Sequence, residues 1–406
     1  MPRRSWMSDG LHVASPEDVR AGKVTDVYFL RGQEVLKAEG ENPHVVAEIR
    51  ASSLHEDWGW AVFAGLDEVL WLLEGRGIAD GRGVDVLSLR EGSVFYAEEP
   101  VMVVAGRYLD FGILETALLG LICQASGVAT MAARCKLAAA ARPVYSFGAR
   151  RMHPAIAPMI ERAAYVGGCD GVAAVKSAEL LGLPPVGTMA HALILILGEE
   201  RAWRGFDRVI DGRVPRVALV DTFQDEKFGA VAAALTLGRH LTAVRLDTPA
   251  SRRGNFPAIL REVRWELDER GFSEVQIFVS GGIDERRILE LNLFADAYGV
   301  GTAITNAPVV DFALDIVEVD GKPRAKRGKL SGRKHLWECP ECGNRGVSPW
   351  SARLGHCPRC GHRVHELLES WISKGRRRRG YPSPHEIRER TLEQMGAAPN
   401  PFARAE

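Results

Sequence analysis

The sequence predicts an α/β protein in which a β/α barrel follows an α/β sandwich domain and precedes a small zinc ribbon. Between residues 143 and 310, short apolar runs alternate with helical segments, which is the rhythm of parallel β/α units. Before residue 110, glycine turns separate the apolar runs instead. After residue 335, two Cys-x-x-Cys pairs have the spacing of a zinc site.

These patterns divide the chain into successive segments. They are an N-terminal α/β sandwich domain (1–115), connecting helices (116–142), the β/α barrel (143–310), a segment returning to the N-terminal domain (311–335), and the zinc ribbon with the C-terminal tail (336–406). A chain of 406 residues has room for two or three such domains.

The composition is that of an intracellular protein, and we expect it to be cytoplasmic. Lys+Arg and Asp+Glu both number 52, so net charge does not point to nucleic acid or to a membrane. No apolar stretch is expected to be long enough to cross a bilayer, and Met1–Gly10 lacks the apolar region of a signal peptide. Cys123, Cys135 and Cys169 are expected to be reduced core thiols.

The N-terminal part is expected to be mostly β. Its apolar runs include Val45–Ile49, Val69–Leu73 and Val101–Val104. From Phe111 to Ala141 the sequence becomes rich in alanine and leucine, which predicts a connecting helix or helix pair that ends at Pro143.

The barrel segment is expected to place polar residues at the carboxyl ends of its strands. The predicted strands are 144–147, 216–221, 242–247, 275–279 and 297–300, and the predicted helices are 155–164, 172–181, 225–237, 255–270 and 285–294. In a β/α barrel the strand ends form the mouth of the active site. The residues expected there are Arg150, Asp170, His191, Asp221, Arg245, Asp247, Gly281, Gly282, Gly301 and Thr302. A doubly wound sheet is the alternative, but no Gly-x-Gly-x-x-Gly motif supports it.

Two glycine turns follow neighbouring strands. Ser280-Gly281-Gly282 ends one apolar run, and Gly301-Thr302 ends the next. Glycines at such positions let backbone N–H groups approach a phosphate, so the pair predicts a phosphate site.

Four cysteines near the C-terminus predict a structural metal site. Cys339 and Cys342 form one pair, Cys357 and Cys360 the other, with fourteen residues between the pairs. Four thiolates leave no open position for a substrate, so we assign zinc here to folding. The run Arg376–Arg379 raises the possibility of nucleic-acid binding, but the neutral chain favours a solvated surface or a subunit contact.

Taken in order, the barrel motifs resemble the type II phosphoribosyltransferases, and most closely the nicotinate phosphoribosyltransferase family. The resemblance covers roughly residues 20–335 and rests on TDVY, SFGARR, GTMAHA, LVDTF, VRLDT, SGGID and YGVGT. The cysteine-bearing extension resembles that of archaeal-type members. The related quinolinate enzyme shares the barrel and the glycine turns but is shorter and lacks the ribbon.

The resemblance implies a reaction and its cofactors. Nicotinate would be joined to 5-phosphoribosyl-1-pyrophosphate, with release of pyrophosphate and coupled hydrolysis of ATP, in NAD biosynthesis. Mg²⁺ and ATP are the implied cofactors beside structural zinc. The ribose carbon would pass through an oxocarbenium-like state, so catalysis would be mostly electrostatic.

For the base, the resemblance implies an aromatic slot with an arginine beside it. Phe147 would stack on the pyridine ring, and Arg150, with help from Arg151, would bind its carboxylate. Tyr28 would close the other face from a partner subunit, which implies a homodimer or higher homo-oligomer with shared sites. Asp170 occupies the family's acidic position in the following loop.

For the donor and for ATP, the resemblance implies a further set of roles. His191 would be phosphorylated from ATP, although Ala192 replaces the serine that often follows. Asp221, Asp247 and Arg245 would lie near the ribose and the magnesium ion. The remaining implied substrate contacts are Thr188 and Ser280, with Arg252 and Arg253 for the pyrophosphate and Gly281, Gly282, Gly301 and Thr302 for the 5-phosphate. Lys329 and Ser331 lie where the chain would return toward the N-terminal domain.

Three alternatives remain open at this point. A quinolinate or other pyridine-base phosphoribosyltransferase would keep the same barrel. An aldolase or isomerase would need a strand-end lysine, whereas Lys176 and Lys227 fall within predicted helices. A zinc-ribbon protein that binds nucleic acid through Arg376–Arg379 would carry an inert barrel.

Overall fold

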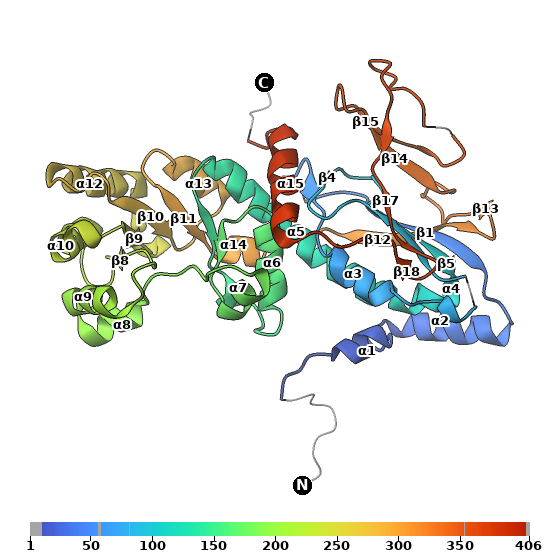
Figure 1. Cartoon of the computed structure of the whole chain (residues 1–406), viewed down its shortest axis with the longest axis horizontal. Coiled ribbons are helices and arrows are strands. Elements are labelled where there is room, and N and C mark those ends of the chain that lie inside the picture. The colour runs from blue at the N-terminus through green and yellow to red at the C-terminus, as the bar shows by residue number, and fades with distance from the viewer. Residues whose placement is uncertain (1–9, 56–57, 81, 353, 403–406) are drawn as a thin grey trace, which may run out of the picture. The chain divides into compact units, whose positions relative to one another are not determined.

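The computed structural model describes residues 10–55, 58–80, 82–352 and 354–402, which form two compact units (Figure 1). Unit 1 combines residues 1–130 with 308–401, and unit 2 holds residues 131–307 with 402–406. Unit 1 is therefore discontinuous in sequence, and unit 2 is inserted into it.

Unit 1 is built on a seven-stranded sheet in the order β13-β12-β1-β5-β3-β17-β18. The strands are β1 (His44–Ala51), β3 (Asp85–Ser88), β5 (Met102–Arg107), β12 (Phe312–Val319), β13 (Lys322–Pro323), β17 (Glu369–Ser373) and β18 (Arg376–Arg377). Strand β1 pairs antiparallel with β5 on one side and with β12 on the other. The returning segment thus completes the N-terminal sheet, and part of the C-terminal tail joins it through β17.

The other elements of unit 1 surround this sheet and the ribbon. They are α1 (Pro16–Arg20), α2 (Val27–Ala38), β2 (Ala61–Val62), α3 (Leu66–Leu73), η1 (Ile78–Asp80), β4 (Val94–Phe95), α4 (Tyr108–Phe111), η2 (Gly112–Leu114) and α15 (Pro384–Ala397). The zinc-ribbon segment adds a three-stranded sheet of β14 (Lys334–Glu338), β15 (Arg345–Pro349) and β16 (His365–Glu366). The N-cap residue of helix α15 is Ser383, whose side chain forms a capping box with Glu386.

The expected strand at Val69–Leu73 was wrong, because these residues belong to helix α3. Leu66, Val69, Leu70 and Leu73 are buried at the spacing i, i+3, i+4, i+7, which puts them on one face of a helix. The residues around Tyr28 are helical as well, in α2, rather than part of a β region.

The long helix α5 (Glu115–Ala139) is the predicted connecting helix. Together with α4 and η2 it forms a stretch, Tyr108–Ala139, that is long and apolar enough to cross a membrane by length and composition. The expectation that no stretch reaches this length was therefore wrong. However, 56% of its most apolar window is buried inside the protein, as in the core helix of a folded domain.

Unit 2 is the predicted β/α barrel, with a parallel six-stranded sheet in the order β7-β6-β11-β10-β9-β8. The strands are β6 (Val144–Ser146), β7 (Gly171–Val172), β8 (Val217–Leu219), β9 (Ala243–Leu246), β10 (Gln276–Ser280) and β11 (Ala297–Val300). The helical elements are η3 (Ala149–Arg151), α6 (Ala157–Val166), α7 (Val175–Leu181), α8 (His191–Leu197), α9 (Glu199–Val209), α10 (Glu226–Leu237), η4 (Gly238–His240), α11 (Ala250–Arg253), α12 (Phe256–Glu269), α13 (Glu285–Leu291) and α14 (Thr302–Thr305). Figure 1 shows α10 and α12 outside the strands.

The strand order is the circular order of a barrel with one gap. Each strand from β8 to β11 lies beside its neighbour in sequence, and β6 then follows β11, as barrel closure requires. Within the described residues no strand pair joins β7 to β8. The chain in this gap contains Pro184 and Pro185, which have no N–H to donate, and a single bond from the Val186 amide to the Val172 carbonyl holds it to β7.

Candidate active site

A cavity of about 530 Å³ opens at the carboxyl ends of the barrel strands. Its walls come from the segments that follow β6, β9, β10 and β11, and from residues 186–190 in the gap. The predicted site residues that line it are Phe147, Arg150, Arg151, Thr188, Arg245, Asp247, Arg253, Ser280, Gly281, Gly282, Gly301 and Thr302. Loops far apart in the sequence therefore meet at one rim, as parallel strands require.

Arg245 and Asp247 form the centre of this cavity. The Arg245 guanidinium lies 3.1 Å from Asp247 Oδ2 and donates to the hydroxyls of Ser280 (2.8 Å) and Thr188 (2.9 Å). Ser280 in turn donates to Asp247 Oδ1 at 2.7 Å. Residues at β-strand positions i and i+2 point to the same face, which explains why Arg245 and Asp247 meet. The arrangement fixes a carboxylate beside a cation at the mouth of the barrel.

Asp221 supports Asp247 from the neighbouring strand end. Its Oδ2 accepts the Asp247 amide at 2.7 Å, and its Oδ1 is buried without a hydrogen-bond partner in the described structure. Burial raises the pKa of the Asp221 carboxyl above its ordinary value, and the hydrogen bond from the Asp247 amide opposes the rise. A carboxylate oxygen without a hydrogen-bond partner is suited to binding a hard cation such as Mg²⁺.

His191 begins α8 at the edge of the same cluster. Its Nε2 lies 3.5 Å from Asp247 Oδ2, and its Nδ1 lies 3.0 Å from the Thr222 hydroxyl. Because Asp247 only accepts hydrogen bonds, the contact favours a proton on Nε2, which leaves Nδ1 to accept from Thr222.

The aromatic side chain of Phe147 lines the cavity and is backed by two further rings. Phe147 packs against Tyr145 and Phe278 with ring centroids 6.4 and 5.6 Å apart, and the Arg245 guanidinium lies 5.4 Å from its centroid. Gly299 on β11 makes room for the Phe147 ring, because a Cβ there would lie 2.5 Å from a ring carbon. An aromatic face of this kind is a surface on which a flat ring can stack.

The backbone conformation of the turn after β10 requires glycine. Gly281 and Gly282 have φ values of +78° and +61°, in the left-handed region that L side chains rarely adopt. A Cβ on Gly281 would also lie 2.9 Å from the Asp247 backbone oxygen and from its Oδ1. The absence of a side chain on Gly281 thus lets the backbone of the turn lie against the Asp247 carboxylate.

Arg150 and Arg151, in η3, also line the cavity and are exposed. Within the described part of the chain, neither guanidinium has a hydrogen-bond or ion-pair partner. Two unengaged cations at a cavity wall are suited to binding an acid.

Comparisons with known proteins identify the family. The models of the quinolinate phosphoribosyl transferase N-terminal and C-terminal domains match residues 26–126 and 128–315. Nicotinate phosphoribosyltransferase pncB2 of Mycobacterium tuberculosis is 31% identical over 356 residues, covering 79% of this chain and 76% of the relative. The chain belongs to the nicotinate phosphoribosyltransferase family.

Solved structures agree with this family fold. The crystal structure of nicotinate-nucleotide pyrophosphorylase from Pyrococcus furiosus is similar with a TM-score of 0.92 and 53% identity, over 96% of this chain and 98% of that one. Human nicotinic acid phosphoribosyltransferase, at 21% identity and a TM-score of 0.74, covers 91% of this chain and 93% of its own, and shows the fold alone.

Asp170 is not where the family resemblance put it. It precedes β7, at the amino ends of the strands, whereas the cavity lies at their carboxyl ends. Its Oδ2 accepts from the Val144 amide at 2.8 Å and from Lys136 Nζ at 2.9 Å. The expectation of a substrate contact is therefore corrected to a structural role that anchors the start of β6.

Arg252 and Arg253 also differ from expectation. Arg252 is exposed and does not line the cavity among the described residues. Arg253 lines it but is only 6% exposed, because its guanidinium is bound to the backbone carbonyls of Thr248 and Gly281. Arg253 thus holds loops together and is not a free cation for pyrophosphate.

The remaining loosely assigned residues lie in unit 1. Tyr28 is 61% exposed on α2. Lys329 pairs with Asp315 at 3.0 Å and donates to the Ser52 hydroxyl. In the arginine run, Arg377 pairs with Glu74 and Arg379 with Glu369. These pairs neutralise part of the charge that a nucleic-acid surface would need.

Several cavity residues were missed by the sequence reasoning. They are Ala173, Val186, Gly187, Met189, Ala190, Pro249, Ala250 and Gly299. Most are small or apolar and supply walls rather than chemistry, so their residue type carries no signal. Three residues that support the site were missed as well. Thr222 contacts His191, and Thr248 contacts both Asp221 and Glu226.

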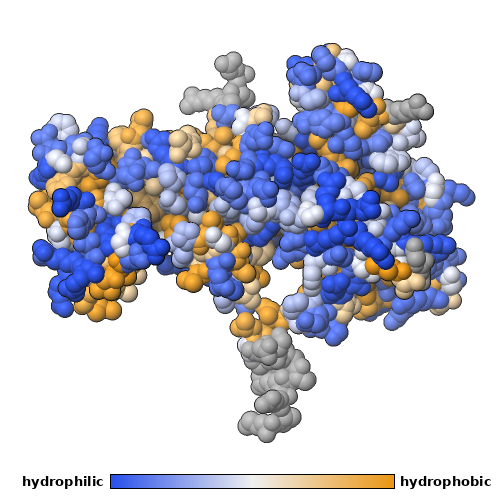
Figure 2. Space-filling model, viewed as in Figure 1, coloured by the Kyte–Doolittle hydropathy of each residue, from blue (hydrophilic) through white to orange (hydrophobic). Residues whose placement is uncertain are grey.

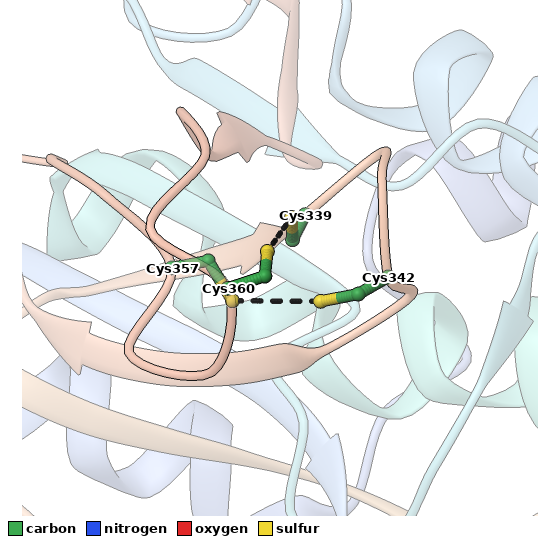
Figure 3. Close-up of side chains that lie close together, drawn as sticks. All are labelled: Cys339, Cys342, Cys357 and Cys360. Atoms are coloured by element: carbon green, nitrogen blue, oxygen red, sulfur yellow. Dashed lines mark hydrogen bonds between the residues drawn. The ribbon is translucent and has the colours of Figure 1, made fainter.

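The four predicted cysteines converge on one point in the ribbon (Figure 3). All four sulfurs lie within 4.8 Å of one another, with 3.4 Å between Cys339 and Cys360 and 3.6 Å between Cys342 and Cys357. A zinc ion with bonds of about 2.3 Å places tetrahedral sulfurs about 3.8 Å apart. The cluster therefore fits a metal ion.

Two turns of the same design carry these cysteines. The Gly343 amide donates to the Cys339 carbonyl, and the Gly361 amide to the Cys357 carbonyl, both at 2.9 Å. Gly343 and Gly361 have φ values of +65° and +76°, in the left-handed region that favours glycine.

A buried ion pair fixes the helix that follows the glycine turn. Arg134 of α5 and Glu285 of α13 are bonded at 2.7 and 2.8 Å, and their side chains are 3% and 9% exposed. We expect Glu285→Leu to lower the free energy of unfolding by about 3–5 kcal/mol, because Arg134 would be left buried without its carboxylate. Denaturant titration measures this loss.

The matched control is Asp268→Asn. It breaks the pair between Asp268 and Arg264 on α12, where the side chains are 48% and 26% exposed. This change is expected to cost less than about 1 kcal/mol. Equal losses for both variants would contradict a special role for the buried pair.

Proposed function

We propose that this protein is a nicotinate phosphoribosyltransferase, which makes nicotinate mononucleotide and pyrophosphate from nicotinate and 5-phosphoribosyl-1-pyrophosphate in NAD biosynthesis. The observation that carries the proposal is that one cavity is lined by Phe147, by the exposed Arg150 and Arg151, by the Asp247–Arg245 pair and by the Gly281–Gly282 turn. The similarity to nicotinate phosphoribosyltransferase pncB2 of Mycobacterium tuberculosis supports it.

The residues suggest how the transfer would be catalysed. Nicotinate would stack on Phe147, with its carboxylate toward Arg150 or Arg151. As the bond to pyrophosphate breaks, positive charge develops on the ribose, and Asp247 would stabilise it. The network of Ser280 and Arg245 keeps that carboxylate oriented without reorganisation during the reaction.

The donor would lie toward the glycine turns. Backbone N–H groups at Gly281–Gly282 and at Gly301–Thr302 would receive the 5-phosphate. Asp221, with its unpaired buried oxygen, and Asp247 are the residues that would hold Mg²⁺. When bound, Mg²⁺ would neutralise charge on the departing pyrophosphate.

The test of the proposal is a comparison of pyridine bases. Purified protein with the phosphoribosyl donor is expected to release pyrophosphate with nicotinate, and far more slowly with nicotinamide. Release with quinolinate alone would reject the assignment. Running each reaction with and without ATP measures whether ATP is consumed.

Quinolinate is the second candidate base, for a specific reason. Two unpartnered guanidiniums, Arg150 and Arg151, line the same wall, and a dicarboxylate would engage both. The match to quinolinate phosphoribosyl transferase domain models is compatible with either base. The Schiff-base alternative has no support, since no lysine of the described chain lines the cavity.

Replacing Arg150 with alanine is expected to raise the KM for nicotinate at least about tenfold, which corresponds to about 1.4 kcal/mol. The reason is loss of the charge-assisted contact to the carboxylate. Steady-state kinetics with varied nicotinate measures the effect. Arg252→Ala, which removes an exposed arginine outside the cavity, is the control, and an unchanged KM in Arg150→Ala would refute the contact.

We propose that ATP is coupled to the reaction through His191. Its imidazole is 41% exposed, and the Nδ1 lone pair is occupied only by the Thr222 hydroxyl. A neutral, accessible ring nitrogen is what a phosphoryl acceptor requires. The ATP arm of the base comparison tests whether the ATP consumption that this role requires takes place.

We propose further that the protein acts as a cytoplasmic homo-oligomer with structural zinc in the ribbon. Val27, Tyr28 and Val35 of α2 are 53%, 61% and 60% exposed, which suits an aromatic offered to a second copy. Figure 2 also shows hydrophobic surface over α8, where Leu195 and Ile196 are 62% and 78% exposed. Light scattering of the zinc-loaded protein tests the assembly.

A further inference from the structure

Buried polar side chains tie together three loops that follow consecutive barrel strands. Glu226 starts α10 after β8, Thr248 follows β9, and Arg253 reaches from α11 to the turn after β10. Their exposed fractions are 8%, 4% and 6%. Buried polar groups of this kind are costly unless they are paired, so the pairing here specifies one arrangement of the loops.

The Thr248 hydroxyl joins the first two loops. It lies 2.6 Å from Glu226 Oε1 and 3.2 Å from Asp221 Oδ2. A hydroxyl has one proton, and the shorter contact shows that Thr248 donates it to Glu226. The preceding residue, Asp247, donates its amide to Asp221 Oδ2 at 2.7 Å. The backbone that carries the central carboxylate is therefore held from both sides.

The Thr248 carbonyl joins the second loop to the third. It accepts from Arg253 Nε at 3.0 Å and from Arg253 Nη2 at 2.8 Å. The same Nη2 donates to the Gly281 carbonyl in the glycine turn. The guanidinium also lies 5.0 Å from the ring centroid of the buried Phe256. One residue, Thr248, thus links α10 to the glycine turn through its hydroxyl and its carbonyl.

We propose that Glu226, Thr248 and Arg253 form a clasp that positions the donor half of the site, namely Asp247 and the Gly281–Gly282 turn. This inference rests on the proposed function. The base half comes from the segment after β6, which carries Phe147 and Arg150 and makes no bond to the clasp in the described structure. Loosening the clasp is therefore expected to weaken use of the phosphoribosyl donor and to spare binding of the base.

The test uses Thr248→Val, which removes the hydroxyl at nearly constant shape. The KM for 5-phosphoribosyl-1-pyrophosphate is expected to rise about tenfold, while the KM for nicotinate stays within about twofold. Thr248→Ser, which retains the hydroxyl, is expected to return the donor KM toward that of the unaltered protein. Equal changes in both KM values, or no change in either, would overturn the clasp.

The matched control is Thr130→Val in unit 1. The Thr130 hydroxyl is also buried and bonded, to the Val62 amide at 2.9 Å and the Ser126 carbonyl at 2.7 Å. Loss of the Thr130 hydroxyl is expected to lower the free energy of unfolding without raising the KM for 5-phosphoribosyl-1-pyrophosphate. Should Thr248→Val fail to fold, Glu226→Met and Glu226→Gln form a second pair, since glutamine keeps an oxygen that accepts from Thr248.

A binding measurement separates this inference from the proposed function. Calorimetry with inorganic pyrophosphate and Mg²⁺ is expected to show affinity reduced about tenfold in Thr248→Val, whatever base the protein uses. Unaltered protein that releases no pyrophosphate with nicotinate would refute the proposed function alone. Equal affinity in the variant and the unaltered protein, or no binding by either, would refute the clasp.

Discussion

Asp247→Asn is expected to lower kcat/KM by about 10³-fold, or about 4 kcal/mol of transition-state stabilisation. Asparagine keeps the shape of the side chain but removes the charge that faces the developing cation. It also places an amide donor against two other donors, the guanidinium of Arg245 and the ring of His191. Steady-state kinetics with both substrates varied measures the loss.

The control for this change is a carboxylate paired in a similar way but outside the cavity. Asp207 on α9 accepts from Arg216 at 2.9 Å and contacts His240 at 3.0 Å. Asp207→Asn is expected to leave kcat/KM within about twofold, since it touches no reacting atom. If Asp247→Asn retained more than a tenth of the activity, the central role of Asp247 would be wrong.

Replacing both Cys342 and Cys357 with serine is expected to abolish zinc binding and unfold the ribbon. Structural zinc in small domains contributes about 10 kcal/mol or more of apparent folding free energy, because no preformed site exists in the unfolded segment. In its described residues the ribbon has a sheet of three short strands and a small core around Cys339, Cys357 and Val364. The zinc content found by metal analysis is expected to fall from one ion per chain to none. New protease cleavage is expected between residues 334 and 366.

Cys123→Ser provides the comparison, because Cys123 lies on α5 outside the quartet and is half-buried. The zinc content and the cleavage pattern of the Cys123→Ser variant are expected to match those of the unaltered protein. Loss of zinc without new cleavage in the ribbon would show that the metal does not hold this segment together.

The barrel could be predicted from sequence because its signals are local. The strand at residues 297–300 and the helix at 226–237 follow from apolar runs, glycine turns and periodicity, all of which are visible within a dozen residues. The cysteine turns are predictable for the same reason. Helix α3 was misread although its buried leucines have helical spacing, because a short apolar run suits a strand equally well.

The details of the site could not be predicted, because they depend on partners far along the chain. Asp170 and Asp221 look alike in sequence, yet Asp170 sits before its strand and Asp221 after its own. Arg253 looks like a free cation until the carbonyls of Thr248 and Gly281 are seen to occupy it. Glu226 lies in a helix start rich in acidic residues, where nothing local separates a solvated carboxylate from a buried one.

The discontinuity of unit 1 has a consequence for the order in which the newly made protein can fold. Strand β1 needs β12 as its neighbour, and Val45 pairs with Val319, so the ribosome must translate residues 131–307 of unit 2 before that edge of β1 is covered. The strands of the barrel can pair with one another as they are translated, whereas the first sheet must wait with one edge of β1 unpaired. Protection of the nascent chain from aggregation therefore matters most for the residues that are made first.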